Sequence, residues 1–297
     1  MAIFESNSIR VAEKNKLYRQ GNISYLTKLN DLADLTDEEY LRMSGMKILN
    51  HVEHPRNRST RQAYPYYYQY NRYDQLPNYV DWRRHNIVTS VKNQGDCGSC
   101  YAFAALGALE SYHRLKTGRL IDLSPQNIID CTNYLGNKGC RGGFTATIFT
   151  YARTYGVLSN GNYPYEYYTQ NYCRWRRNSV EATDEGFYQV NYGDELALKH
   201  AVAKTGPVVA AIAASRWSFR FYRSEALYSS SGIYADRYCG YPNHAVLVVG
   251  YGTDRRYGDY WIIKNSWGTR WGMNGYAFIA RNRNNMCHIA SFSMLPR

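Results

Sequence analysis

The chain has 297 residues, of which 44% are hydrophobic and 20% charged, with 23 Gly and only 8 Pro. This composition excludes a disordered, collagen-like or coiled-coil description of the whole chain and predicts a sizeable buried core. The longest purely aliphatic run, Ala245 to Val249, is far shorter than the roughly 20 apolar residues of a membrane span. A formal charge of +12 permits attraction to acidic surfaces without establishing it.

Residues 1–75 differ in composition from the rest of the chain, since they contain no Cys and no Trp. They end in a run with six tyrosines among residues 64–73. A run so biased, without helical or strand periodicity, is typical of an extended linker, and we expect it to be accessible to proteases. Because Met1 is not followed by an apolar stretch of about 7 to 15 residues, we expect no signal peptide in this chain.

The pattern after residue 76 predicts helices first and strands later. Gly residues end several helical segments, and Ser124-Pro125 is a favourable start for one of them. The expected helices are Ser99–Thr117, Gln126–Asp130, Thr145–Tyr155 and Asp194–Lys204. The expected strands are Val208–Ala213, Ala245–Tyr251, Tyr260–Lys264 and Gly275–Arg281. This order indicates an α+β fold of two packed subdomains with a cleft between them.

Seven cysteines form an odd set. In an oxidising compartment such a set indicates three disulfides and one thiol that is kept free. The lack of a visible export signal conflicts with that compartment, and we resolve the conflict by expecting that the start of the protein is missing from this chain. Parity alone does not say which cysteine is free.

Cys100 lies in the most informative motif of the chain. It closes the run Gln94-Gly-Asp-Cys97-Gly-Ser-Cys100 and falls in the first turn of a predicted helix. A sulfur at a helix N-terminus lies near unpaired amide groups, and a neighbouring imidazolium would favour the thiolate further. A His-paired thiol of this kind has a pKa of about 3 to 4. We therefore expect Cys100 to be a nucleophile across the physiological pH range.

The spacing of Cys97 and Cys100 has two other interpretations. A redox dithiol would be expected after a βαβ pattern, which the sequence does not show. A zinc site would need a second pair at similar spacing, and Cys131 and Cys140 are too far apart. Both alternatives are weaker than a nucleophilic cysteine.

Two downstream residues complete a candidate catalytic set. His244 precedes the predicted strand that begins at Ala245, and Asn265 follows the strand Tyr260–Lys264. A carboxamide can orient an imidazole so that its other nitrogen faces a sulfur, and the nearby Trp267 would keep water from that contact. A lone His in such a place is usually structural, but the combination of Cys, His and Asn in this order predicts nucleophilic catalysis.

With these motifs the sequence resembles the papain-like cysteine proteases, and within them the cathepsin L, S and K group. The resemblance covers nearly the whole chain. Its further segments are Leu76–Trp82, Leu115–Leu120, Leu123–Asn127, Gly136–Phe144 and Cys287–Phe292. It implies a papain-like fold with a helical left domain, an antiparallel β-barrel right domain, an active-site cleft between them, and a helical propeptide in front.

The N-terminal segment resembles the inhibitory propeptide of that family. The residues that follow the family pattern are Phe4, Asn7, Val11 and Asn15, and then residues 30–36. Met1 falls inside this pattern, so we expect the signal peptide and the first propeptide turns to be absent from the chain. The resemblance implies a partial propeptide and linker over 1–75 and a mature peptidase domain over 76–297. The mature domain would be mainly helical to about residue 185 and mainly β from about residue 186.

The resemblance assigns roles to four residues. Cys100 would be the nucleophile, His244 the general acid and base, and Asn265 the group that orients the imidazole. Gln94 would donate its side-chain amide to an oxyanion hole beside the Cys100 backbone amide. The reaction would be acyl transfer through a thioester. The disulfides implied by the family are Cys97 to Cys140, Cys131 to Cys173 and Cys239 to Cys287, which leaves Cys100 free.

The same resemblance indicates how a peptide would bind. Gly142 and Gly143 would let a substrate backbone approach closely and pair in an extended form. The other implied substrate-binding positions are Phe144, Thr145, Ala211, Pro242, Asn243, Trp267 and Phe292. The main specificity pocket is apolar, so we expect a hydrophobic residue at the second position before the cleaved bond. No insertion with paired histidines interrupts residues 131–144, which favours endopeptidase activity.

The expected partners are protein and peptide substrates, the chain's own propeptide as inhibitor, and cystatin-type inhibitors. The resemblance implies a monomer without metal or cofactor, lysosomal or secreted. Because Lys and Arg are dispersed along the chain, we expect no nucleic-acid partner, and because no apolar run is long enough to span a membrane, we expect no membrane partner. The main alternative is a non-catalytic relative that binds peptides. A second alternative, motivated by 31 Tyr, is a tyrosine-rich matrix protein.

Overall fold

The computed structural model describes residues 2–48, 66–170, 172–224 and 232–297. Helices over these residues are α1 (Ala2–Arg19), α2 (Asp37–Arg42), α3 (Cys100–Thr117), α4 (Pro125–Cys131), α5 (Thr145–Tyr155), α6 (Glu195–Thr205) and α7 (Trp217–Arg220). Short 3₁₀ turns are Trp82–His85, Asn133–Leu135, Gly139–Arg141, Arg177–Ser179 and Met286–His288.

The strands before residue 200 have two or three residues each, and the longest strands, β10 and β11, lie after it. They are β1 (Leu26–Thr27), β2 (Tyr66–Tyr67), β3 (Val80–Asp81), β4 (Val157–Leu158), β5 (Val180–Ala182), β6 (Phe187–Gln189), β7 (Val208–Ile212), β8 (Tyr222–Arg223), β9 (Ile233–Tyr234), β10 (His244–Asp254), β11 (Gly258–Lys264), β12 (Tyr276–Ala280) and β13 (Ser293–Pro296). The four predicted strands correspond to β7, β10, β11 and β12, with β10 and β11 longer than expected.

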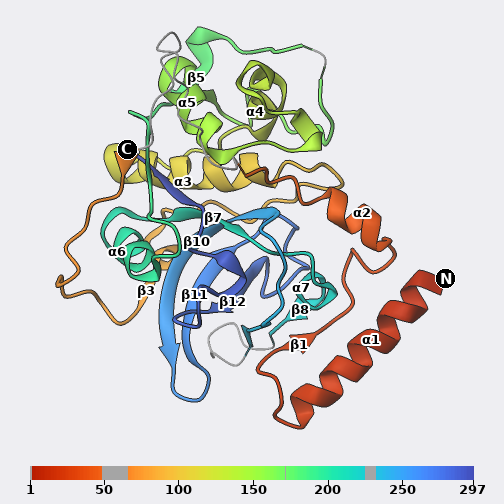
Figure 1. The fold of residues 1–297 in the computed structure, drawn as a ribbon. Coiled ribbons are helices and arrows are strands. Elements are labelled where there is room, and N and C mark those ends of the chain that lie inside the picture. The colour runs from red at the N-terminus through yellow and green to blue at the C-terminus, as the bar shows by residue number, and fades with distance from the viewer. Residues whose placement is uncertain (1, 49–65, 171, 225–231) are drawn as a thin grey trace, which may run out of the picture.

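α3 is the central helix of the molecule and separates the other helices α4 and α5 from the large sheet (Figure 1). Every residue from Cys100 to Ser111 is buried, because both sides of the helix are covered. Small Ala residues let α3 lie close to its neighbours, and Gly118, with a φ of 78°, ends it. The four helices predicted after residue 76 are confirmed, with ends within one residue.

The main sheet has nine strands in the order β2-β6-β13-β7-β10-β11-β12-β9, with β3 paired to β10. All pairs are antiparallel except β2–β6 and β9–β12. Successive side chains of β10 point to opposite faces of the sheet. Ala245, Leu247 and Val249 therefore join the core around α3, whereas Val246 and Val248 join the core around α6. The helices and the sheet meet directly along this strand.

The N-terminal segment runs along one side of the sheet before it reaches α3 (Figure 1). β1 pairs antiparallel with β8, which attaches the segment after α1 to the C-terminal half of the chain. α2 begins with a capping box, in which Thr36 and Glu39 satisfy each other's backbone amides. Residues beyond α2 then lead towards the N-terminus of α3.

The tyrosine-rich run is more ordered than its composition predicts. Tyr66 and Tyr67 form β2, and the Tyr68 amide donates to the Gln189 carbonyl. Tyr68 is only 8% exposed, and its hydroxyl is hydrogen-bonded to His200 at 2.9 Å. The expectation of an accessible linker is wrong at Tyr68, because an edge strand supplies partners for its backbone and α6 covers its ring. Residues 64 and 65 lie outside the described residues.

Three disulfides tie the loops around α3 and the sheet. They join Cys97 to Cys140, Cys131 to Cys173 and Cys239 to Cys287. This is the pairing that the resemblance implied, and Cys100 is free and buried.

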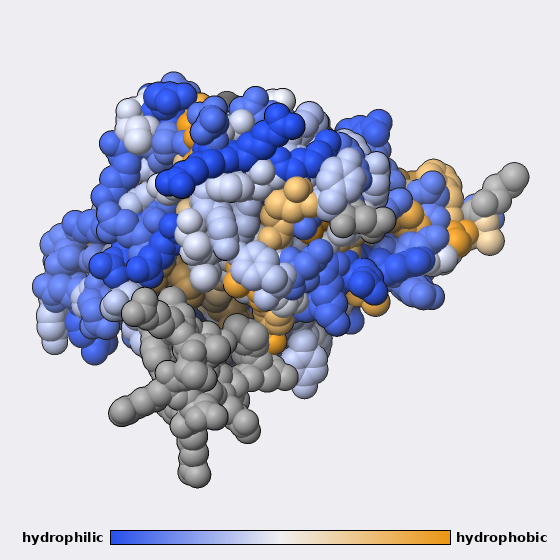
Figure 2. Space-filling view, turned by 90° about the horizontal axis from the view of Figure 1, so that it is seen from above, coloured by the Kyte–Doolittle hydropathy of each residue, from blue (hydrophilic) through white to orange (hydrophobic). Residues whose placement is uncertain are grey.

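The face of the molecule seen from above is mostly hydrophilic, with apolar residues in small scattered groups (Figure 2). Most of the large apolar side chains that are exposed are tyrosines, whose hydroxyls remain in contact with water. Among the described residues, no helix is long and apolar enough to cross a membrane.

Candidate active site

Cys100 is the first residue of α3, and the chain before it is held firmly. The Cys97–Cys140 disulfide and a hydrogen bond from the Gly98 amide to the Cys140 carbonyl fix this turn. Ser99, which precedes the helix, makes no side-chain capping bond, although its carbonyl accepts from the Ala102 amide at 2.8 Å. The sulfur accepts hydrogen bonds from backbone amides that include Tyr101 and Ala245. The amide of Ala245 places the thiol beside the start of β10.

His244 begins β10, and Asn265 follows the end of β11. The two strands are neighbours, with Leu247 opposite Lys264. The His244 Nε2 and Asn265 Oδ1 atoms are 2.7 Å apart. Because the carboxamide oxygen accepts, Nε2 carries the proton and Nδ1 keeps its lone pair. Within the described part of the chain, Nδ1 has no hydrogen-bond partner.

Trp267 covers the contact between His244 and Asn265. Its ring centroid lies 4.5 Å from that of His244, with an interplanar angle of 35°. His244 is fully buried and Asn265 nearly so. The sequence-based interpretation of Trp267 as a shield against water agrees with this geometry.

Burial determines the protonation of this site. It raises the pKa of Cys100 to about 11, and the amides that donate to the sulfur only partly oppose the shift. It also lowers the pKa of His244 to about 4, although the bond to Asn265 opposes this. In this form of the protein, burial therefore favours the neutral thiol and the neutral imidazole. The expectation that Cys100 is a nucleophile across the physiological pH range stays a prediction, because the structure describes the form in which the chain itself covers the site.

The covering residues are Met43 to Lys47, which follow α2. The amides of Gly45 and Met46 donate to the Cys100 sulfur. The Gly143 amide donates to the Gly45 carbonyl and the Lys47 amide to the Gly143 carbonyl, each at 2.9 Å. This segment therefore pairs with the same glycine that was predicted to bind a substrate backbone.

Gln94 is fully buried beside this segment. Its Nε2 donates to the carbonyl oxygens of Met43 at 2.7 Å and Cys97 at 2.8 Å, and its Oε1 accepts from the Ser266 hydroxyl at 2.6 Å. Ser266 thus orients the amide, a contact that sequence reasoning missed. The only local signal for it is that Ser266 follows Asn265.

The remaining predicted binding positions lie on both sides of the boundary between helices and sheet. The Ala211 amide of β7 donates to the Phe292 carbonyl at 3.2 Å, and the Thr145 hydroxyl lies 3.5 Å from the Met294 sulfur. The Asn243 carbonyl accepts from the Met46 amide at 3.1 Å. Gly142, Phe144 and Pro242 lie in the loops that border α5 and β10, with Gly142 in contact with Gly45.

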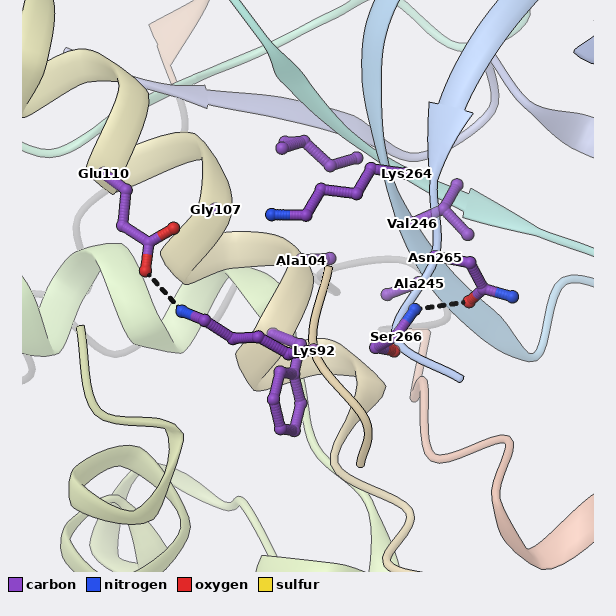
Figure 3. A pocket seen from close by; sticks show the side chains of 11 residues that line it. Lys92, Ala104, Gly107, Glu110, Ala245, Val246, Lys264, Asn265 and Ser266 are labelled. Carbon is purple, nitrogen blue, oxygen red and sulfur yellow. Dashed lines mark hydrogen bonds and ion pairs between the residues drawn. The ribbon is translucent and has the colours of Figure 1, made fainter. Parts of the chain in front are cut away.

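A buried charged group lies behind Asn265 (Figure 3). Glu110 of α3 pairs with Lys92 at 2.8 Å and accepts from the Thr89 hydroxyl at 2.5 Å. Lys264 donates to the Thr89 carbonyl at 2.8 Å, and burial lowers its pKa to about 8. Lys92, Glu110 and Lys264 line a pocket of about 20 Å³ that reaches Asn265. The network connects α3 to β11 next to the candidate catalytic residues.

The donor set of the site does not resemble a metal centre. Among the described residues, no group of three or more His, Cys, Asp or Glu side chains is arranged to hold a metal ion.

Comparison with known proteins connects both parts of the chain to described families. Residues 76–297 match the model "Papain family cysteine protease", and residues 1–40 match "Cathepsin propeptide inhibitor domain (I29)". In an alignment of 299 positions the chain is 42% identical to cathepsin L of Sarcophaga peregrina, with 100% of this chain and 85% of the relative covered. In an alignment of 300 positions it is 44% identical to cathepsin S of Mus musculus, with 99% of this chain and 82% of the relative covered.

A solved structure shows the same arrangement. The digestive procathepsin L 3 of the Tenebrio molitor larval midgut superposes with a TM-score of 0.86 at 38% identity. The match covers 99% of this chain and 90% of that one.

Proposed function

The chain belongs to the papain family of cysteine proteases, with a papain-like fold and a cathepsin propeptide inhibitor domain, and it is a cysteine-type endopeptidase. From this premise we propose that it hydrolyses peptide bonds through a thioester on Cys100. His244 acts as general acid and base, and Asn265 orients the imidazole. The observation that carries this assignment is the bond from His244 to Asn265 under Trp267, next to a free cysteine at a helix N-terminus.

The steps of the reaction follow from these positions. Once the site is open, His244 Nδ1 takes the proton of the Cys100 thiol, and the thiolate attacks the substrate carbonyl carbon. The Gln94 amide and the Cys100 backbone amide stabilise the negative oxygen. The amine leaves with the proton from His244, and water then attacks the thioester with His244 as base. Hydrolysis releases the acid and restores the thiol.

We propose that residues 1–75 are removed when the enzyme matures. In the intact chain the Met43 carbonyl accepts a hydrogen bond from the Gln94 side-chain amide, and the Gly45 and Met46 amides donate to the Cys100 sulfur. These groups would have to be free for the oxyanion and nucleophile roles. The intact chain is therefore expected to be latent and the processed chain active.

Substrate preference is proposed from the apolar main pocket. Ala211, Phe292 and Thr145 lie around β7 and β13, and the Phe292 ring packs edge-on against Tyr192. We propose that this pocket takes a hydrophobic side chain at the second residue before the cleaved bond. Because three disulfides suit an oxidising compartment, we further propose that the protein is lysosomal or secreted.

The test uses the full chain before and after acid processing. A thiol-directed epoxide should label Cys100 in the processed form. In a peptide library, the processed form should prefer peptides with an apolar residue at the second position before the cleaved bond. Cys100→Ala should abolish both labelling and turnover. Binding of peptides without cleavage would overturn the proposal, and a strong preference for Arg at that position would overturn the specificity.

A further inference from the structure

Arg220, the last residue of α7, is buried by the propeptide region. It is 0% exposed, although Arg216, which directly precedes the same helix, is exposed. The guanidinium packs on the rings of Tyr40 and Phe221, with centroid distances of 5.2 and 4.9 Å. Only one of these two rings, that of Phe221, belongs to residues 76–297.

The polar partners of the Arg220 side chain all precede residue 48, among the residues that the structure describes. Nε donates to the Leu32 carbonyl at 3.0 Å and Nη2 to the Leu35 carbonyl at 2.5 Å. Nη1 lies 3.4 Å from the Asp37 carboxylate. Removal of the propeptide would leave an ionised guanidinium without these acceptors, since Arg is not deprotonated in proteins.

The covering segment crosses the active site in a fixed order. Its contacts join Met46 to Gly143, Gly45 to Cys100, Met43 to Gln94, Tyr40 to Trp267 and Asp37 to Arg220. Cys100 lies between the two ends of this path, so Gly143 and Arg220 lie on opposite sides of the sulfur. If substrate residues before the cleaved bond lie along Gly143, the residues after it extend towards Trp267 and Arg220.

We propose that Arg220 is a specificity-determining residue of the processed enzyme, which favours substrates with an acidic side chain two or three residues after the cleaved bond. This inference rests on the proposed proteolytic function. Asp37 and the carbonyls of Leu32 and Leu35 stand in for the substrate carboxylate and backbone oxygens in the intact chain. A guanidinium forms paired hydrogen bonds with a carboxylate that a lysine or an amide cannot reproduce.

Aromatic residues lead from the catalytic histidine to this position. The Tyr40 ring packs edge-on against Trp267 at 5.5 Å, and the Tyr40 hydroxyl donates to the Ala214 carbonyl at 2.5 Å. Trp267 in turn packs on His244. Once the propeptide is removed, a substrate side chain can fill the space that the Tyr40 ring occupies against Trp267. Arg220 lies on the side of this space that faces away from the catalytic histidine.

The experiment measures kcat/KM of the acid-processed full chain for peptides that share one sequence before the cleaved bond. The peptides carry Glu, Gln or Lys at the second or the third residue after it. We expect Glu to be favoured over Lys by about five- to tenfold, a size typical of one partly exposed charge-assisted contact. The preference should fall as salt is raised, because exposed charges are screened.

Variants separate the role of Arg220 from general effects. Arg220→Gln should remove the preference, Arg220→Lys should keep part of it, and Arg255→Gln, at an exposed turn after β10, should leave it unchanged. Equal rates for Glu, Gln and Lys in the unaltered enzyme would overturn the inference even if Arg220→Gln did not fold. Absence of turnover for every peptide would overturn the proposed function and this inference with it.

Discussion

Gly45 lies closer to the backbone of the catalytic domain than any side chain would allow. A Cβ built on it would be 1.6 Å from the Gly98 carbonyl oxygen. The two positions that face it, Gly98 and Gly142, are also glycines. A Cβ on Gly142 would be 2.5 Å from the Gly45 carbonyl oxygen. Because the obstacles are backbone atoms, no rotation of a side chain can relieve them. Three glycines thus let the propeptide lie directly over Cys100.

The substitution Gly45→Ala should therefore open the site of the intact chain. Forced contacts of this kind cost about 1 to 3 kcal/mol, which corresponds to a change in population of about 5- to 150-fold. We expect a thiol-directed epoxide to label Cys100 of the intact variant at least about fivefold faster than the parent. Gly161→Ala is the matched control, because a Cβ there meets nothing within 4 Å. Equal labelling of both variants would show that the close approach is not needed for latency.

The thiol and thiolate forms of Cys100 give a second prediction. Burial raises the pKa of Cys100 to about 11 in the intact chain. Since the thiolate is the reactive form, alkylation by iodoacetamide should be slow at pH 7 and rise about tenfold per pH unit up to pH 10. The processed enzyme should instead react rapidly at neutral pH.

Cys100→Ala is the control for this measurement, because the other six cysteines are paired. It should take up no label. A rate in the intact chain that is constant between pH 7 and 10 would contradict the covering of the thiol.

At the residue scale, the sequence identified the kinds of groups but not their state. Cys100 at a helix start, and His244 and Asn265 at strand ends, follow from local patterns, and the structure brings the last two into contact. The raised pKa of Cys100 does not follow from such a pattern. It comes from burial, to which the segment from Met43 to Lys47 contributes, although the Gly45 and Met46 amides themselves lower the pKa. This segment is far away in the chain and carries no motif that shows where it lies.

At the scale of elements, helices were easier to predict than short strands. The bounds of α3 and α5 follow from Gly118 and Gly156, which end them, and from Ala-rich or apolar sequence within one segment. β2 has only two residues and exists because β6 supplies its hydrogen bonds. A strand defined by a distant partner leaves little trace in its own composition.

The segment after β2 gives a stability prediction for this element. Tyr68 is buried, and its hydroxyl bonds to His200, whose other ring nitrogen is 2.8 Å from the Asp74 carboxylate. Tyr68→Ala should lower the free energy of unfolding of the intact chain by about 2 to 4 kcal/mol, as expected for removal of a buried aromatic ring. Urea unfolding followed by fluorescence measures the change.

Tyr73→Ala is the matched control, because Tyr73 is 81% exposed and belongs to the same tyrosine-rich run. Its effect should stay within about 0.5 kcal/mol. Similar losses for the two variants would mean that the run contributes through composition and not through the docking of Tyr68.

At the scale of the whole molecule, we expect protonation of His244 to be linked to the covering of the active site by the propeptide region. Burial lowers the pKa of His244 to about 4 from an ordinary value near 6.5. We expect this pKa to rise when the propeptide residues move away, so that the covered state binds fewer protons than the open state between these two pH values. Acidification through this window favours the open state, by up to about 1.4 kcal/mol per pH unit. Above the window the contribution of His244 to covering is fully present.

Two ion pairs also join the propeptide region to the catalytic domain. Asp31 pairs with Arg270 at 2.6 Å, and Asp37 lies 3.4 Å from Arg220. His244 itself faces no charged partner among the described residues, so its effect arises from burial.

This linkage is tested by amide hydrogen exchange of residues 32–48, corrected for the intrinsic effect of pH, in full chains that carry Cys100→Ala and cannot process themselves. Protection should fall between pH 6.5 and 4 when His244 is present, and should fall much less in the additional variant His244→Gln, which has no proton to gain. His85→Gln, at an exposed histidine, should behave as the parent. If His244→Gln lost protection over the same range as the parent, the linkage between protonation of His244 and opening of the site would be contradicted.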